Sequence, residues 1–355
     1  MGYALAPPPP GCNSTMSVLD RHQRPLGNLR LSVTDRCNMR CGYCMPEDNY
    51  TWLERPEVLT LAELTVLVEA FCLLGVRKLR LTGGEPLLRG DLVEMMRMFR
   101  ANKSLEDIAM TTNGVLLADL APKLQEAGVG RITVSLDSLR PDRFFGLSKR
   151  KALPKVMAGL RALRDLGYRK TKIDTVVLRD VNDDELIDLI EFGREMKAQV
   201  RFIEYMDVGG ATRWSMDSVV TKAQILDRLE AHYGAFEKVG VRTSAPADRY
   251  RLPDGTVFGV ISSTTDPFCS ACDRSRITAD GTWYTCLYAR SGRDLRTPLR
   301  EGIGAQGLAD LIRAGWSVRE DRGAEERVEL SKRSALFDPS ELRDDPRLEM
   351  HSRGG

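Results

Sequence analysis

The stretch "LRLSVTDRCNMRCGYC", residues 29–44, joins a short β-rich run to a loop that carries three cysteines. Cys37, Cys41 and Cys44 have the spacing C-x3-C-x2-C. A closed tetrahedral metal site needs four ligands and a disulfide framework needs an even number of cysteines, so three thiolates in one loop complete neither. A cubane iron–sulfur cluster can be held by three thiolates, which leaves one iron for an outside ligand. The alternative is a zinc knuckle that a distant residue completes.

Length and composition indicate a globular protein of one large domain or two smaller ones. The chain has 355 residues, 52 of them basic and 50 acidic, and this balance argues against a nucleic-acid or membrane-surface binder. No apolar run approaches membrane-spanning length. Residues 1–17 contain four consecutive prolines and no secretory signal, so we expect a disordered leader. Eight cysteines without an export signal favour a reducing compartment, and we expect the cytoplasm.

From residue 29 to about residue 205, β-rich runs alternate with amphipathic helical windows. Thr60 and Glu63 predict a capping box, and Gly75, Gly128 and Gly167 stand just past helix ends, where a left-handed cap favours glycine. Six β-α units imply parallel strands with right-handed crossovers, and the pattern alone allows a doubly wound open sheet or an incomplete barrel. The expected strands are residues 29–33, 78–82, 107–111, 131–136, 172–178 and 201–205, and the expected helices are residues 60–74, 91–101, 117–127, 152–166 and 182–197.

Unusual segments stand at the ends of five of these strands. The cysteine loop follows the first, "TGGEP" (82–86) ends the second, "TTNG" (111–114) the third, "SLDS" (135–138) the fourth, and Met206 closes the sixth. The carboxyl ends of parallel strands share one face, so we expect one common cavity. In that cavity, Gly83 and Gly84 allow close approach of the backbone to a ligand, and Glu85 offers an acceptor for an ammonium group.

A second cysteine group lies beyond the point where the β-α repeat stops, after Asp207. Residues 246–287 resemble hairpins, and they carry Cys269, Cys272 and Cys286 with the spacing C-x2-C-x13-C. A zinc ribbon would need one more ligand. A second cluster with one open iron fits three thiolates better.

Basic residues occur in strands, where a charge is costly unless it is paired or binds a ligand. Arg274 and Arg276 alternate in "DRSR", so both guanidinium groups can lie on one face of an extended segment. Arg30 and Arg80 lie within the first two strands, and Lys172 begins the fifth. A salt bridge explains any one of them, but five cations near one cavity suggest a polyanion such as a triphosphate.

The first cysteine motif, with the aromatic Tyr43 before its last cysteine, resembles the radical S-adenosylmethionine (SAM) superfamily. The resemblance implies an incomplete (βα)6 barrel of the TIM type. It also implies a [4Fe-4S] cluster on Cys37, Cys41 and Cys44, whose open iron chelates SAM so that SAM is cleaved to a 5′-deoxyadenosyl radical. The SAM contacts that it implies are Tyr43, Gly84, Ser135 and Met206.

The complete set of motifs resembles the GTP 3′,8-cyclase family of molybdenum cofactor biosynthesis over residues 29–355. The set comprises both cysteine groups, "TGGEP", "TTNG", "SLDS", "CDRSRIT" and a terminal Gly-Gly. It implies conversion of GTP to (8S)-3′,8-cyclo-7,8-dihydroguanosine 5′-triphosphate, with guanine bound by a second [4Fe-4S] cluster on Cys269, Cys272 and Cys286. It also implies that Gly354 and Gly355 reach the site. The GTP contacts that it implies are Arg30, Arg80, Thr111, Lys172, Arg274, Ser275 and Arg276.

The resemblance extends to partners and organisation. It implies cyclic pyranopterin monophosphate synthase as the acceptor of the product, and an electron donor. We expect a radical SAM partial barrel at residues 18–245, a cluster-binding region at 246–335 and a tail at 336–355, in a monomer or homodimer. A radical SAM peptide-modifying enzyme is one alternative, although such enzymes tend to carry more C-terminal cysteines. A zinc-stabilised nucleic-acid-binding module is a weaker one, because near-neutral charge and the β-α pattern oppose it.

Overall fold

The computed structural model describes residues 17–47, 49–241 and 243–354. The expected leader, apart from Ser17, therefore lies outside the described residues, as do Cys12 and Gly355. The strands are β1 (Asn28–Ser32), β2 (Lys78–Thr82), β3 (Asp107–Thr112), β4 (Arg131–Ser135), β5 (Lys172–Val177), β6 (Gln199–Glu204), β7 (Glu237–Val239), β8 (Asp248–Arg251), β9 (Val257–Ile261), β10 (Arg274–Ile277), β11 (Thr282–Tyr284) and β12 (Arg293–Asp294). The α-helices are α1 (Leu61–Leu73), α2 (Leu92–Ala101), α3 (Leu117–Glu126), α4 (Pro141–Ser148), α5 (Leu153–Asp165), α6 (Leu186–Glu195), α7 (Lys222–Tyr233), α8 (Arg296–Arg300), α9 (Gly304–Ser317), α10 (Gly323–Val328) and α11 (Pro339–Asp344).

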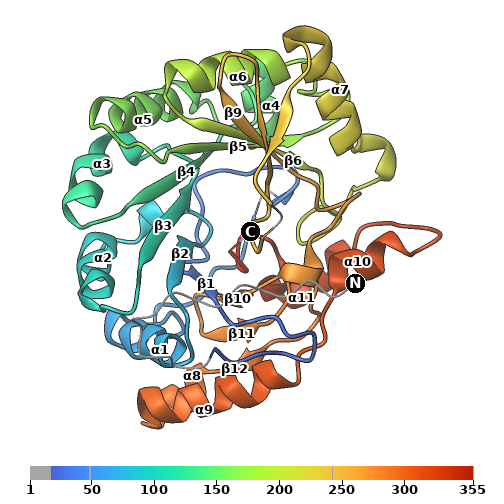
Figure 1. The fold of residues 1–355 in the computed structure, drawn as a ribbon. Coiled ribbons are helices and arrows are strands. Elements are labelled where there is room, and N and C mark those ends of the chain that lie inside the picture. Colours follow the sequence, from blue (N-terminus) through green and yellow to red (C-terminus); the bar gives the residue numbers. More distant parts are fainter. Residues whose placement is uncertain (1–16, 48, 242, 355) are drawn as a thin grey trace.

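The described strands form one twelve-stranded sheet in the order β12-β11-β10-β1-β2-β3-β4-β5-β6-β9-β8-β7. The run from β10 through β1 to β6 and β9 is parallel throughout, whereas β11, β12, β8 and β7 pair antiparallel at the two edges. The sheet curves around the centre of the molecule, and helices α1 to α6 lie outside it (Figure 1). The α/β fold with an incomplete (βα)6 barrel that the sequence predicts is confirmed.

Strand alternation separates an apolar outer face from a polar inner face. In β1 the side chains of Leu29 and Leu31 are fully buried against the helical layer, whereas Arg30 points to the other side and is half-buried. Successive side chains of a strand point to opposite faces, so the charged residues at alternate positions line the inside of the barrel. The inner face of this barrel is therefore built for a polar ligand.

The helix caps follow the sequence signals. The Thr60 side chain accepts from the Glu63 amide, and the Glu63 carboxylate accepts from the Thr60 amide at 2.7 Å, which completes the expected capping box. Gly75, Gly128 and Gly167 all have a positive φ, as expected past helix ends.

Two expectations about helices need correction. The helix expected at 182–197 is only Leu186–Glu195, because the Asn182 side chain accepts from the Leu178 amide and donates to the Val176 carbonyl, which holds a turn. The extra helix Pro141–Ser148, before α5, was not expected.

The C-terminal region shares both the sheet and the core of the barrel. Its strands β9 and β10 extend the parallel run at opposite ends. Phe71 of α1 meets Trp283 of β11 edge to face, with ring centroids 6.4 Å apart. The boundary at residues 245 and 246 remains a prediction. Within the described part of the chain, no helix combines the length and apolar character needed to cross a membrane.

Candidate active site

The first cysteine group occupies the loop after β1, at the carboxyl end of the strands. Cys37, Cys41 and Cys44 are free thiols of intermediate exposure. Burial raises the pKa of Cys37 to about 11, and burial followed by neighbouring negative groups raises the pKa of Cys41 and of Cys44. Thiols in such surroundings become thiolates when a metal supplies positive charge. Three soft donors that lie close enough to raise one another's pKa fit an iron–sulfur cluster.

The two glycines after β2 pack against the start of this cysteine loop. The Gly84 amide donates to the Thr34 carbonyl at 2.8 Å, and the Glu85 amide donates to the Arg36 carbonyl at 2.8 Å. A Cβ on Gly83 would overlap the Thr34 carbonyl, and one on Gly84 would overlap that of Arg36. Glycine is therefore needed here for backbone contact within the chain, and this contact places Gly84 beside the cysteine loop.

Glu85 is buried in the protein, and this corrects its expected role as an open acceptor. Its carboxylate is fully buried and accepts from the Thr112 hydroxyl and the Asn113 amide, both at 2.7 Å, and from the Leu87 amide at 3.0 Å. Burial raises the pKa of Glu85 to about 7. Through these hydrogen bonds, Glu85 links the segment after β2 to the end of β3.

Tyr43 is held by a carboxylate that the sequence analysis did not single out. Its hydroxyl donates to Asp137 at 2.6 Å, and the Asp137 carboxylate also accepts from the Val176 amide at 2.9 Å. Burial raises the pKa of Asp137 to about 6. Asp137 belongs to the "SLDS" segment, two residues after Ser135, so the cysteine loop and the end of β4 meet as expected.

Met206 follows β6 and lies in an apolar cluster with Cys269, Cys286 and Met350. The structure therefore brings this expected SAM contact into the same cluster as the second cysteine group and the tail. The neighbouring Asp207 is fully buried and forms ion pairs with Arg327 and Arg333 at 2.7 Å, which fastens the end of β6 to the C-terminal segment.

The second cysteine group lies beside the expected Arg274 and beside Arg319, which the sequence analysis missed. Arg319 donates to the Cys272 carbonyl at 2.9 Å, and its guanidinium lies 3.6 Å from the Cys272 sulfur. Burial opposes ionisation of Cys272, but the charges of Arg274 and Arg319 outweigh it and lower the pKa of that thiol. Burial raises the pKa of Cys286 to about 11. No spacing signal marks Arg319, because it lies 47 residues beyond Cys272.

The cations expected at the cavity form a row across the inner face. Arg276, Arg30 and Arg80 are direct neighbours on β10, β1 and β2. Arg80 donates to the Thr111 hydroxyl at 3.0 Å, and Lys172 begins β5 on the same face. Ser275 does not join them, because alternation turns its hydroxyl to the outer side, where it accepts from the Trp283 indole at 2.5 Å.

Burial and mutual repulsion perturb the pKa values of these cations. The pKa of Lys172 is lowered to about 7 and that of Arg276 to about 10. Burial is the larger cause for both residues, and repulsion by neighbouring arginines is the second. Burial also lowers the pKa of Arg80 to about 10. A row of desolvated cations of this kind is stabilised by a bound anion.

Three inner-face charges escaped the sequence analysis, namely Arg131, Asp174 and Arg201. Arg131 stands in the same register row as Arg80, and Asp174 lies opposite Arg201. The alternation that exposed Arg30 and Arg80 would have found them, since each occupies an inner-face position of β4, β5 or β6.

The C-terminal tail enters the barrel. The Gly354 carbonyl accepts from Arg30 at 2.6 Å and from Arg276 at 3.0 Å, and a Cβ on Gly354 would overlap the Thr82 hydroxyl. Arg353 is fully buried. Gly354 thus meets two of the expected substrate-binding cations, while Gly355 lies outside the described residues.

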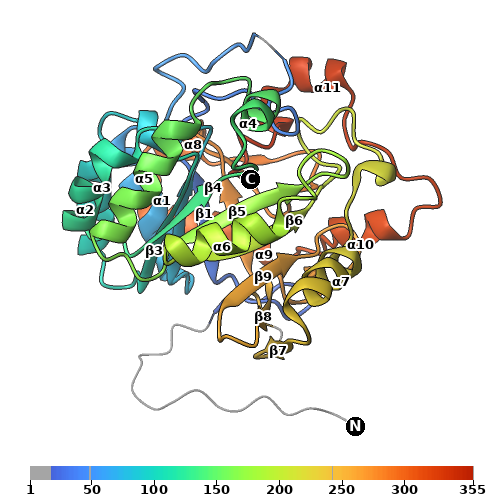
Figure 2. The same cartoon turned by 90° about the horizontal axis from the view of Figure 1, so that it is seen from above.

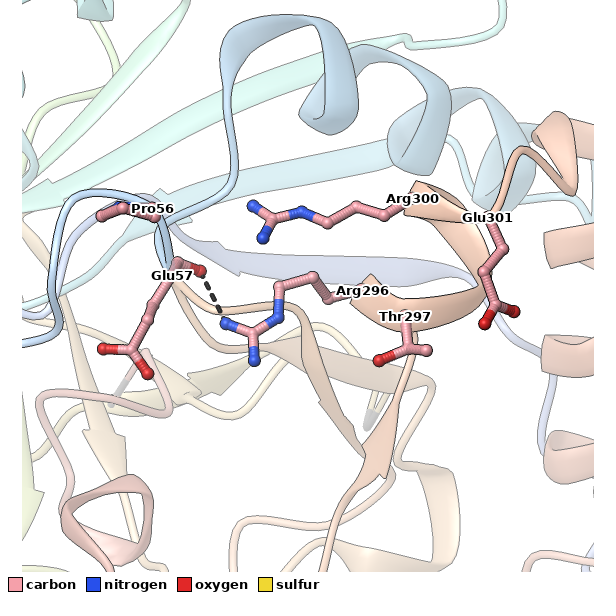
Figure 3. Close-up of a pocket in the computed structure, with 6 residues that line it drawn as sticks. All are labelled: Pro56, Glu57, Arg296, Thr297, Arg300 and Glu301. Carbon is pink, nitrogen blue, oxygen red and sulfur yellow. Dashed lines mark hydrogen bonds between the residues drawn. The ribbon is translucent and has the colours of Figure 1, made fainter.

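A surface hollow of about 460 Å³ lies between the segment before α1 and helix α8 (Figure 3). There Arg296 donates to the Glu57 carbonyl at 2.9 Å. None of the expected site residues is among the described residues that line it, so we assign it no role in the site.

A partial (βα)6 barrel with three cysteines in the loop after its first strand defines a radical SAM protein. The Radical SAM superfamily matches residues 31–193, and Molybdenum Cofactor Synthesis C matches residues 198–325. The fold resembles the crystal structure of Streptococcus suis SuiB bound to S-adenosylmethionine, with a TM-score of 0.59 and 13% identity over 85% of this chain and 78% of that one. At this identity the likeness concerns the fold alone.

Among curated proteins, "GTP 3',8-cyclase 1" of Mycobacterium tuberculosis is 54% identical over 95% of each chain. "GTP 3',8-cyclase 3" of Mycobacterium bovis is 53% identical over 97% of this chain and 92% of its own length, and the Xanthomonas campestris "GTP 3',8-cyclase" is 45% identical over 90% and 95%. The chain belongs to the GTP 3′,8-cyclase family. Membership in this radical SAM family entails use of SAM and an iron–sulfur cluster. The alternative prediction of a zinc-stabilised nucleic-acid-binding module is therefore wrong.

Proposed function

We propose that this protein is a GTP 3′,8-cyclase that converts GTP to (8S)-3′,8-cyclo-7,8-dihydroguanosine 5′-triphosphate, the first step of molybdenum cofactor biosynthesis. The row of buried cations on the inner face of the barrel carries the proposal. Arg276, Arg30 and Arg80 lie side by side there, and Cys272 and Cys286 of the second cysteine group are close enough to influence the pKa of Arg276. A polyanionic nucleotide suits such a row, because its phosphate groups offset the cost of burying several guanidinium groups side by side.

Each cysteine group would hold one [4Fe-4S] cluster, through Cys37, Cys41 and Cys44 and through Cys269, Cys272 and Cys286. The bound first cluster would supply the electron that cleaves SAM, and the resulting deoxyadenosyl radical would remove the 3′ hydrogen of GTP.

The protein's own residues position the two reactants. Asp137 holds the Tyr43 ring beside the first cysteine group, where it can border SAM together with Gly84 and Ser135. The inner-face cations would bind the triphosphate and the second cysteine group would anchor the guanine. Fixing both ends of GTP orients C3′ toward SAM, and such positioning removes much of the entropic barrier.

The surroundings of the reaction follow from its chemistry. The product would pass to cyclic pyranopterin monophosphate synthase, and an electron donor of the cytoplasm would reduce the clusters. Thiolate-bound clusters suit that reducing compartment. We propose no nucleic-acid or membrane partner.

The test is an oxygen-free assay with reconstituted protein, SAM, dithionite and either GTP or ATP. We expect 5′-deoxyadenosine and a cyclised guanosine triphosphate with GTP, and neither product in quantity with ATP. Cys37→Ala should abolish both, whereas Cys72→Ala, which changes a buried thiol of α1 outside both groups, should retain them. SAM cleavage without a cyclised nucleotide would overturn the proposal in favour of another radical SAM reaction.

The number of clusters has its own measurement. Reconstituted protein should contain two clusters' worth of iron and sulfide, and Cys269→Ala should contain half as much. Stoichiometric zinc, or an unchanged iron content in Cys269→Ala, would refute the assignment of the second group.

A further inference from the structure

A second opening of the barrel lies at the amino ends of the strands. A cavity of about 290 Å³ is bounded by the first residues of three parallel strands, Arg131, Lys172 and Gln199, and by the hairpin of β7 and β8. The hairpin stands at the end of the barrel opposite α4 and α11 (Figure 2). At about 30 Å³ per water molecule, the cavity has room for roughly ten waters, and therefore for phosphate groups.

Cations dominate the walls of this cavity. Lys172, Arg201 and Arg249 line it, and among the described residues none of the three has a carboxylate within ion-pair distance. Two further lining cations are paired, Arg131 with Asp107 and Lys238 with Asp248. Burial and the neighbouring arginines lower the pKa of Lys172. Asp174 acts on Lys172 and Arg201 but forms no ion pair with either among the described residues, so the cavity keeps an excess of positive charge, which concentrates anions there.

The cations continue from the opening into the site. Arg249 is exposed at the rim, Arg201 and Lys172 lie deeper, and the charges of Arg131 and Arg201 act on Arg80 further inside. Arg80 in turn neighbours Arg30 in the row described above. Positive charges therefore extend from the rim of the cavity to the row of cations in the site.

On the carboxyl-end side, the protein's own tail lies against the row of cations. Gly354 is bonded to Arg30 and Arg276 inside the barrel, and the buried Arg353 guanidinium donates to the Leu287 and Ala289 carbonyls at 2.9 and 2.7 Å. A nucleotide arriving from that side would have to break these hydrogen bonds. One arriving beneath the β7–β8 hairpin would not.

We propose that the nucleoside triphosphate enters and leaves through the opening between the β7–β8 hairpin and the amino ends of β4, β5 and β6. This inference rests on the proposed function, which supplies the substrate. The base enters first and travels toward the cysteine groups, and the trailing phosphates remain among the cations. This is the reverse of the usual barrel arrangement, in which ligands approach from the carboxyl ends of the strands.

The test is stopped-flow binding of GTP to the reconstituted full-length protein, monitored by tryptophan fluorescence at several salt concentrations. Arg249→Glu should lower the association rate constant by about tenfold and weaken its salt dependence, with a smaller change in the dissociation rate constant. Val241→Glu places a negative charge at a rim position that is 87% exposed, so it should act in the same direction without disturbing the fold. SAM binding should not change in either variant.

Two controls separate the routes. Arg251→Glu alters the same strand at an exposed residue that pairs with Glu237 and does not line the cavity, so GTP association should stay within about twofold. A chain truncated after Ser352 should likewise associate at the full-length rate.

The outcomes are distinct. Faster association on truncation, together with unchanged association in Arg249→Glu and Val241→Glu, would place access at the tail and overturn the inference. A change confined to the dissociation rate constant would make Arg249 a static phosphate contact and would also overturn it. A wild-type protein that does not bind GTP at all would instead refute the proposed function.

Discussion

Replacing Arg353 by alanine should release the tail from the barrel. The guanidinium is fully buried, donates to the carbonyls of Arg347, Leu287 and Ala289 at 2.7 to 2.9 Å, and lies 4.1 Å above the Tyr284 ring. Each buried acceptor left without its donor costs about 1–3 kcal/mol, and the substitution affects these three carbonyls. A loss of about 4 kcal/mol would reduce the ratio of docked to undocked tail roughly a thousandfold, since 1.4 kcal/mol is a factor of ten.

Hydrogen exchange measures this loss directly. The amides of Ser352 and Arg353 donate to the carbonyls of Glu349 and Met350, so they should exchange far faster in the variant while the barrel strands keep their protection. Arg343→Ala is the matched control, because that side chain is 63% exposed and lies 4.0 Å from Glu47, and surface pairs contribute about 0–1 kcal/mol. Protection at residue 352 that stays within threefold of wild type in Arg353→Ala would refute the reasoning.

Four further predictions concern residues of the site. The pKa of Lys172 is lowered to about 7, so in the free protein its charge is lost as pH rises through that value. The Kd for GTP, measured by isothermal titration, should therefore increase above pH 7. This pH dependence should vanish in Lys172→Met. Between about pH 7 and the ordinary lysine pKa of about 10.4, residue 172 binds more protons in the unfolded chain than in the folded protein. The free energy of unfolding of the wild type should therefore rise with pH across this range, and it should rise less in Lys172→Met. Asp137→Ala should weaken SAM binding, measured by equilibrium dialysis, because the Tyr43 hydroxyl loses its hydrogen-bond acceptor. Asp137→Asn can still accept from that hydroxyl, so it should keep part of the affinity for SAM. Equal losses of affinity in the two variants would contradict the role of Asp137 in holding Tyr43. Arg319→Gln removes a positive charge 3.6 Å from the Cys272 sulfur, so the reduction potential of a cluster held there should fall. A redox titration followed by electron paramagnetic resonance measures this potential. The first cluster is the internal control, and its potential should not change.

Helix caps, strands and cysteine motifs of this protein could be predicted from the sequence, because they depend on residues that are close together along the chain. The capping box at Thr60 depends on two side chains three residues apart, and the six strands of the β-α repeat depend on apolar alternation. Both cysteine groups are recognisable because their spacing is itself the chemical requirement. The repeat alone left an open sheet and a partial barrel equally possible, and the resemblance to a known superfamily chose correctly between them.

Only the tertiary structure decided which partners the buried charges meet. Glu85 is enclosed by donors from the end of β3 and the residue that follows it. Arg319 reaches Cys272 and Arg353 reaches Leu287 from segments 47 and 66 residues away. The physical reason is that burial, counter-charge and hydrogen-bond partners arise when distant segments are packed together, and no spacing along one strand or loop encodes them.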